Sequence, residues 1–120
     1  MRIDASGSVT LANSGHVPPY LNGELAQMEG ALPLGVVEEA KCSVTCFVLK
    51  PHDRLVLVSD GILEATDTDG QLFGFDRIHE LMGSGASAVE VADAAEKFGQ
   101  EDDISVISIT RTVETVVAVA

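Results

Sequence analysis

Carboxylates stand beside two strand-like segments of this sequence. Asp60 follows the apolar run LVLVS (55–59), and Asp102 and Asp103 precede the alternating run ISVISI (104–109). Strand ends bring side chains to the rim of a sheet, so these carboxylates would converge if the two strands are neighbours. Close carboxylates repel each other unless a proton or a cation lies between them. Mg²⁺ and Mn²⁺ prefer oxygen ligands, so the pattern fits a site for either cation.

The position of Asp60 has a second interpretation, which the spacing alone leaves open. Aspartates at strand ends also form turns or cap helices. The motif DTDGQLFG, which begins at Asp67, superficially resembles a calcium-binding loop, but Ile78 stands where that loop needs a glutamate, so a turn is expected. Ser59 lacks the surrounding glycines of a nucleophilic serine.

The elements that position these aspartates follow from the period of the apolar residues. Ser87 and Glu90 form a capping-box pattern at a helix start, and Gly99 ends that helix. Asn22-Gly23 indicates a hairpin turn. The nearly continuous apolar run of 54–59 predicts a strand covered on both faces. Strands are expected at 8–13, 41–49, 54–59 and 104–110, and helices at 76–82 and 87–98.

The order of strands, then helices, then a strand predicts an α+β fold with a mainly antiparallel sheet. Cys42 and Cys46 lie four residues apart on a predicted strand, which separates them by roughly 13 Å and excludes a disulfide. We therefore expect reduced thiols that face the core together with Val44 and Val48. This spacing on a strand is also wrong for zinc.

The composition restricts the classes of partner. The 120 residues carry a formal net charge of −12, which opposes binding to nucleic acid or to an anionic membrane and permits binding of cations. The N-terminal residues lack the apolar region of a signal peptide, and no apolar run approaches the ~18 residues that span a bilayer. These features predict a cytoplasmic protein.

Four stretches resemble the C-terminal part of PPM-type (type 2C) metal-dependent protein serine/threonine phosphatases, most closely the SpoIIE/RsbU branch that regulates sigma factors. They are LANSGHVPPYL (11–21), ALPLGV (31–36), LKPHDRLVLVSDGILEATDTDGQLFGFDRI (49–78) and GQEDDISVISITR (99–111). The resemblance implies part of an αββα sandwich. It places a phosphatase-domain segment at 1–111 and a tail at 112–120.

The resemblance also implies roles for individual residues. Asp60 and Asp102 match the family's metal ligands, so they are the expected catalytic and metal-binding residues. Gly61 matches the glycine that lets the chain turn beside the metal, and Asp103 matches a position that supports the site through backbone bonds. His16 matches a residue for which an orienting or structural role is expected. Two Mn²⁺ or Mg²⁺ ions are expected in the complete domain.

The activity implied by the resemblance is hydrolysis of phosphoserine or phosphothreonine by metal-activated water. The implied partner is a phosphorylated protein, an anti-anti-sigma factor of the STAS type. The family's N-terminal half carries a metal-bridging aspartate in a glycine-rich motif, and Asp4 does not match it. We therefore expect a fragment or a truncated product, inactive alone and prone to self-association, of an active parent. The alternative is a non-catalytic module of this fold that binds a partner.

Overall fold

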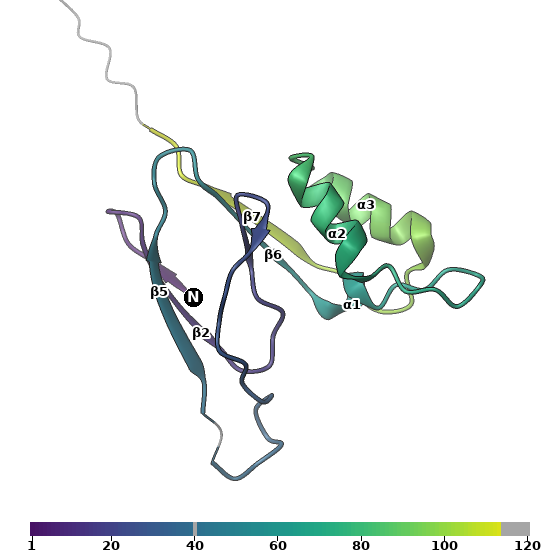
Figure 1. The fold of residues 1–120 in the computed structure, drawn as a ribbon, viewed down its shortest axis with the longest axis horizontal. Helices are drawn as coiled ribbons and strands as arrows, with labels where there is room; N and C mark the ends of the chain where they lie inside the picture. The colour runs from purple at the N-terminus through teal and green to yellow at the C-terminus, as the bar shows by residue number, and fades with distance from the viewer. Residues whose placement is uncertain (40, 114–120) are drawn as a thin grey trace, which may run out of the picture.

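The computed structural model describes residues 1–39 and 41–113. This part of the chain contains short and long strands followed by helices and a last strand, as expected (Figure 1). The strands before the helices are β1 (Arg2–Ile3), β2 (Ser8–Asn13), β3 (Tyr20–Leu21), β4 (Glu24–Leu25), β5 (Ser43–Val48) and β6 (Arg54–Val58). The remaining elements are α1 (Asp60–Leu63), α2 (Gly74–Gly83), α3 (Ala88–Gly99) and β7 (Val106–Thr110).

The strands form two antiparallel sheets. One sheet has the order β1-β2-β5, and the other has the order β4-β3-β6-β7. The strand β6 therefore lies inside its sheet, between β3 and β7, as its continuous apolar sequence predicts. β6 and β7 pair from Arg54 with Thr110 to Val58 with Val106. The two strands that flank the predicted acidic sites are thus neighbours.

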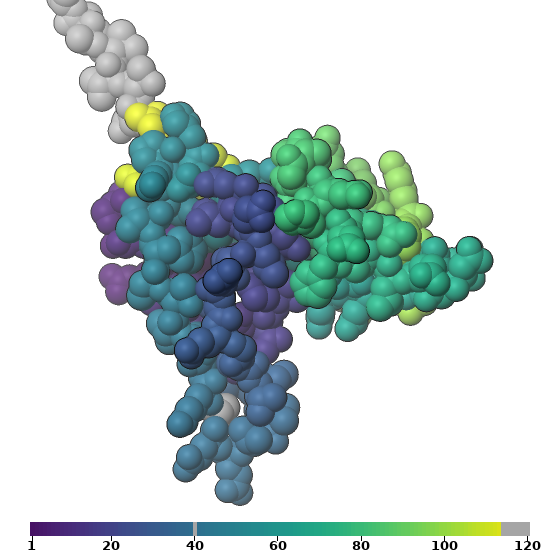
Figure 2. Space-filling model, in the orientation of Figure 1, coloured from purple at the N-terminus to yellow at the C-terminus, as the bar shows by residue number. Residues whose placement is uncertain are grey.

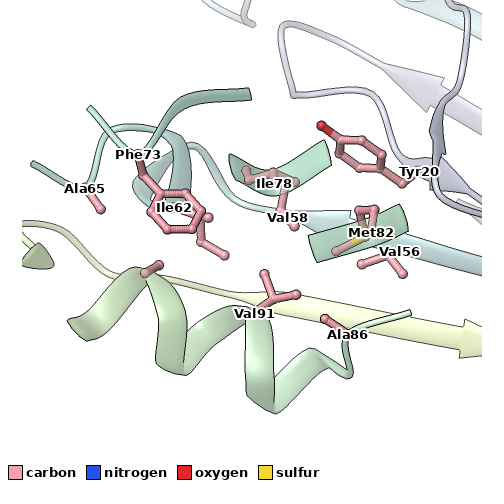
Figure 3. Packing of buried hydrophobic residues seen from close by; sticks show 11 residues of the cluster. Tyr20, Val56, Val58, Ile62, Ala65, Phe73, Ile78, Met82, Ala86 and Val91 are labelled. Atoms are coloured by element: carbon pink, nitrogen blue, oxygen red, sulfur yellow. The ribbon is translucent and has the colours of Figure 1, made fainter. Parts of the chain in front are cut away.

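The larger core lies between the helices and the four-stranded sheet (Figure 3). It comprises Tyr20, Val56, Val58, Ile62, Ala65, Phe73, Ile78, Met82, Ala86, Val91 and Ala95. A second, smaller cluster of Val9, Leu49 and Leu55 packs with the partly buried Phe47 and Ile109. Alternate residues of β6 enter the two clusters, so the four-stranded sheet is covered on one face by helices and on the other by the second sheet.

The helix α3 begins as its sequence predicts. The Ser87 side chain accepts a hydrogen bond from the backbone N–H of Glu90, and the Glu90 carboxylate accepts one from the backbone N–H of Ser87. This reciprocal pair satisfies two N–H groups that a helix start leaves without intrahelical partners. Val91 and Ala95 form the buried stripe of the helix, whereas Val89 is exposed.

The prediction that Cys42 and Cys46 face the core is wrong. Both thiols are exposed, and Val44 and Val48 on the same face retain 62% and 54% of their accessible surface. The opposite face of β5 carries Phe47, which packs against the cluster between the sheets. Alternation correctly predicted a strand with two different faces, but the more apolar face is the one that is open to solvent in the described part of the chain.

Two further features concern the outer parts of the molecule. The loop that follows β4 projects from the sheets, and α2 and α3 form a block beside them (Figure 2). The large hydrophobic side chains that are exposed among the described residues of this loop are Leu32, Leu34, Val36 and Val37. Most of the predicted tail, residues 114–120, lies outside the described residues. None of the helices in the described ranges combines the length and the apolar character needed to cross a membrane.

Candidate metal site

Asp60 lies at the point where β6 ends and α1 begins. Ser59 is the extended N-cap residue, with φ −75° and ψ 159°, and Asp60 is the first residue of the helix. The interpretation of Asp60 as the helix cap is therefore not supported. Its side chain is exposed, and its Oδ1 accepts a hydrogen bond of 3.1 Å from the backbone N–H of Gly61. This position leaves the carboxylate at the rim of the sheet.

Asp102 and Asp103 lie in the loop between α3 and β7, with exposed side chains. Asp102 Oδ1 accepts a hydrogen bond of 2.8 Å from the backbone N–H of Asp103. The side-chain amide of Gln100 donates to the backbone carbonyl of Asp102 at 3.0 Å. These local bonds restrict the turn that carries both aspartates. Asp103 contributes to them through its backbone.

Three contacts between backbone groups hold the segment that carries Asp60 against the segment that carries Asp102. The backbone N–H of Ser59 donates to the carbonyl of Ser105 at 2.9 Å, which continues the β6–β7 pairing. Gly61 lies so close to the Asp103 carbonyl that the two groups leave no room for a Cβ atom on Gly61. Farther along, the N–H of Thr66 donates to the carbonyl of Gly99 at 2.9 Å. The two loops therefore run side by side.

The donor chemistry of this region is that of a site for a hard cation. Carboxylate oxygens are ligands that Mg²⁺ and Mn²⁺ accept, and exposed carboxylates leave space for the waters that Mg²⁺ retains. Within residues 1–39 and 41–113, however, no group of three or more His, Cys, Asp or Glu side chains is arranged to hold a metal ion. The residues present thus fit part of a metal site, with Asp60 and Asp102 as its candidate ligands.

His16 has contacts that organise the loop after β2. The side chain of Asn13, which is 9% exposed, bonds both backbone groups of His16. Its Oδ1 accepts from the His16 N–H, and its Nδ2 donates to the His16 carbonyl, both at 2.8 Å. The imidazole Nδ1 lies 2.8 Å from the carbonyl oxygen of Val17. The Asn13 bonds involve only the backbone of His16, so the role expected for its side chain stays a prediction.

The fold has the layered α+β arrangement with antiparallel sheets that characterises PPM-type phosphatase domains of the RsbU and SpoIIE kind. The family model described as Stage II sporulation protein E (SpoIIE) matches residues 2–112, and the chain belongs to this family. A search among curated proteins found no match.

Two solved structures are similar to the chain. The RsbU and RsbW domains of Rv1364c from Mycobacterium tuberculosis superpose with a TM-score of 0.71 and 24% identity, over 95% of this chain and 35% of that chain. The phosphatase domain of the cell fate determinant SpoIIE from Bacillus subtilis, presoaked with Mn, gives a TM-score of 0.65 and 24% identity. That match covers 96% of this chain and 56% of that chain. The present chain thus spans about a third of the first structure and just over half of the second.

Proposed function

We propose that this chain is the C-terminal part of a metal-dependent phosphatase domain that hydrolyses phosphoserine or phosphothreonine in a protein substrate. The observation that carries the proposal is the meeting of two acidic segments at the rim of the sheet. Strand β6 delivers Asp60, the loop before β7 delivers Asp102, and the contact of Gly61 with the Asp103 carbonyl keeps the two segments together.

In this proposal, Asp60 and Asp102 hold Mn²⁺ or Mg²⁺ with their carboxylates. The bound cation would supply an activated water and neutralise charge on the phosphoryl group. Gly61 leaves space for the chain to approach Asp103. The backbone N–H of Asp103 orients the Asp102 carboxylate, and the side-chain amide of Gln100 holds the Asp102 backbone carbonyl. The exposure of both aspartates leaves them accessible to a phosphorylated side chain on another protein.

The proposed substrate is a phosphorylated STAS-domain protein of the anti-anti-sigma type. Membership of the SpoIIE family supports a phosphoprotein substrate, and one structural relative contains an RsbU domain together with an RsbW domain. The net charge of −12 makes nucleic acid an unfavourable partner.

A second candidate function applies to the 120 residues taken alone. Because the described ranges assemble no group of three metal-binding side chains, we propose that this chain without further ligands is a poor phosphatase. Two carboxylates and waters hold a divalent cation weakly. In that state the chain would act as a partner-binding module with the phosphatase fold.

The test compares the 120-residue chain with the full-length parent, using a phosphorylated STAS-domain protein and p-nitrophenyl phosphate in the presence of Mn²⁺. We expect metal-dependent turnover by the parent, its loss in Asp60→Asn and Asp102→Asn, and little turnover by the short chain. Asp93→Asn, which removes one exposed carboxylate on α3, is the matched control and should retain activity. Full activity of the parent after Asp60→Asn would refute the proposal, and equal turnover by the short chain would refute its inactivity.

A further inference from the structure

We propose that Ser59 is a positioning residue, whose hydroxyl fixes the loop of Asp102 against Asp60 where β6 turns into α1. This inference rests on the proposed metal-dependent function, because it concerns the two candidate ligands. Ser59 is partly buried and directly precedes Asp60. Ser59 lacks the surrounding glycines of a nucleophilic serine. We therefore explain the hydroxyl at this position by its hydrogen bond.

The backbone carbonyl of Ser59 belongs to the helix. In an antiparallel ladder, the pairing of Val58 with Val106 would continue with Ser59 opposite Ser105 and two backbone bonds between them. One of these bonds is present, from the Ser59 N–H to the Ser105 carbonyl at 2.9 Å. The second bond would run from the Ser105 N–H to the Ser59 carbonyl. That carbonyl instead accepts a hydrogen bond of 3.2 Å from the N–H of Ile62 in the first turn of α1.

The Ser59 hydroxyl takes the place of that carbonyl. Its Oγ accepts a hydrogen bond of 2.9 Å from the backbone N–H of Ser105. The chain can therefore leave the ladder and start a helix at the same residue without losing the bond to the neighbouring segment. A residue without a hydroxyl would leave the Ser105 N–H without this acceptor. Threonine keeps the hydroxyl and is an accepted N-cap residue.

The bond matters for Asp102 because that residue lies outside the strand. β7 begins at Val106, so the loop from Gln100 to Ser105 has no ladder of its own. Ser105 is held by Ser59, and Asp103 is held by its contact with Gly61. Ser59 and Gly61, the neighbours of Asp60 in sequence, thus both contact the loop that carries Asp102. Without the hydrogen bond from Ser105 to Ser59, the carboxylate of Asp102 would sample positions in which it no longer shares a cation with Asp60.

The chain offers a matched control within the same strand pair. Ser108 on β7 accepts a hydrogen bond of 2.9 Å from Arg54 Nε on β6. Ser59→Ala and Ser108→Ala each remove one serine hydroxyl that links β6 with β7, but only Ser59 adjoins the aspartates. Ser59→Thr is the conservative variant that should restore the wild-type behaviour.

The experiment follows backbone amide signals of the 120-residue chain by NMR, with exchange into deuterated water and with titration by Mn²⁺. In the wild type, one Mn²⁺ concentration should broaden the amide signals of Asp60 and Asp102 together. In Ser59→Ala, we expect faster exchange of the Ser105 amide and about a fivefold higher Mn²⁺ concentration for half-broadening, as the loss of one hydrogen bond implies. Ser59→Thr should bind Mn²⁺ with the affinity of the wild type. Ser108→Ala should also keep the wild-type Mn²⁺ affinity, although its melting temperature should be similar to that of Ser59→Ala.

The outcomes separate this inference from the proposed function. Wild-type Mn²⁺ affinity in Ser59→Ala, or an equal loss in Ser108→Ala, would overturn the positioning role while leaving the metal site in place. Mn²⁺ broadening that survives Asp60→Asn, or that never reaches both loops of the wild type, would overturn the proposed metal site and this inference together.

Discussion

Gly61 packs directly against the backbone carbonyl of Asp103, although 42 residues separate them in sequence. The φ angle of Gly61 is not positive, so its backbone conformation is open to any residue. The glycine is needed for space alone, because a Cβ atom there would collide with a backbone oxygen that cannot rotate away. This contact therefore reports directly on how closely the two acidic loops approach each other.

Gly61→Ala should lower the free energy of unfolding by about 1–3 kcal/mol, the usual cost of forcing an extra carbon into a packed site. Gly83→Ala is the matched control, since Gly83 also lies in a helix without positive φ, and a methyl group added there would meet no neighbouring side chain or loop within 4 Å. Urea denaturation of both variants measures the difference. Equal stability of the two variants would show that the Gly61 contact is not tight in solution.

Ser87→Ala should destabilise the protein by about 1 kcal/mol, because the start of α3 loses the acceptor for the Glu90 N–H. Ser84→Ala serves as the comparison, since the hydroxyl of this exposed serine donates to the carbonyl of Leu81 at the end of α2. Surface substitutions of that kind change stability by less than about 0.5 kcal/mol. Thermal denaturation of the two variants distinguishes these effects, and a Ser87 loss no larger than that of Ser84 would contradict the capping argument.

Asp53 should make stability depend on pH. The side-chain amide of Asn22 and then the backbone N–H of Lys50 donate to its carboxylate and lower its pKa below the ordinary value of 3.8. Because the folded-state pKa is lowered, this stabilisation is complete above about pH 3.8 and is lost as the pH falls through the folded-state pKa.

The Asp53 argument predicts the behaviour of Asp53→Asn. The variant should be less stable than the wild type at pH 7, and the difference should shrink below pH 4. Denaturation at several pH values tests the difference, and a ¹³C titration of the carboxyl group gives the pKa itself. A measured pKa at or above 3.8, or a difference that does not change with pH, would refute the role assigned to Asn22 and Lys50.

The outer face of β5 should promote self-association at physiological salt. Val44 and Val48 are exposed on one face of a strand, and salt screens the repulsion between chains of charge −12. Val44→Thr combined with Val48→Thr should shift the chain toward monomer in sedimentation velocity. Val89→Thr removes an equally exposed valine from α3 and should leave the association unchanged. A monomeric wild type would show that this face does not self-associate.

The sequence predicted most elements because their signals are local. The caps at Ser87 and Gly99 and the apolar run of 54–59 are visible in short stretches, and the predicted helices and strands begin within a few residues of the expected positions. The predicted orientation of Cys42 and Cys46 was wrong, because alternation distinguishes the two faces of a strand without indicating which face another layer covers. That information comes from the packing of whole sheets.

The candidate site was predictable only in part, for a similar reason. Asp60 and Asp102 stand out because each lies beside a strand, and the pairing of β6 with β7 confirms that these strands are neighbours. The bond between the Ser59 hydroxyl and the Ser105 N–H has no signature in the sequence. It depends on two segments 46 residues apart and on the redirection of one backbone carbonyl into a helix.

The separation of Ser59 from Ser105 has a consequence for folding. The 45 intervening residues contain α1, α2 and α3, so the two segments meet only when that long loop closes. Loop closure carries an entropy cost that must be offset by contacts inside the loop, and here those contacts are the packing of Ile62, Ile78 and Val91 against β6. The two acidic loops should therefore come together late, after the helical layer has condensed, and local unfolding of that layer should separate them first.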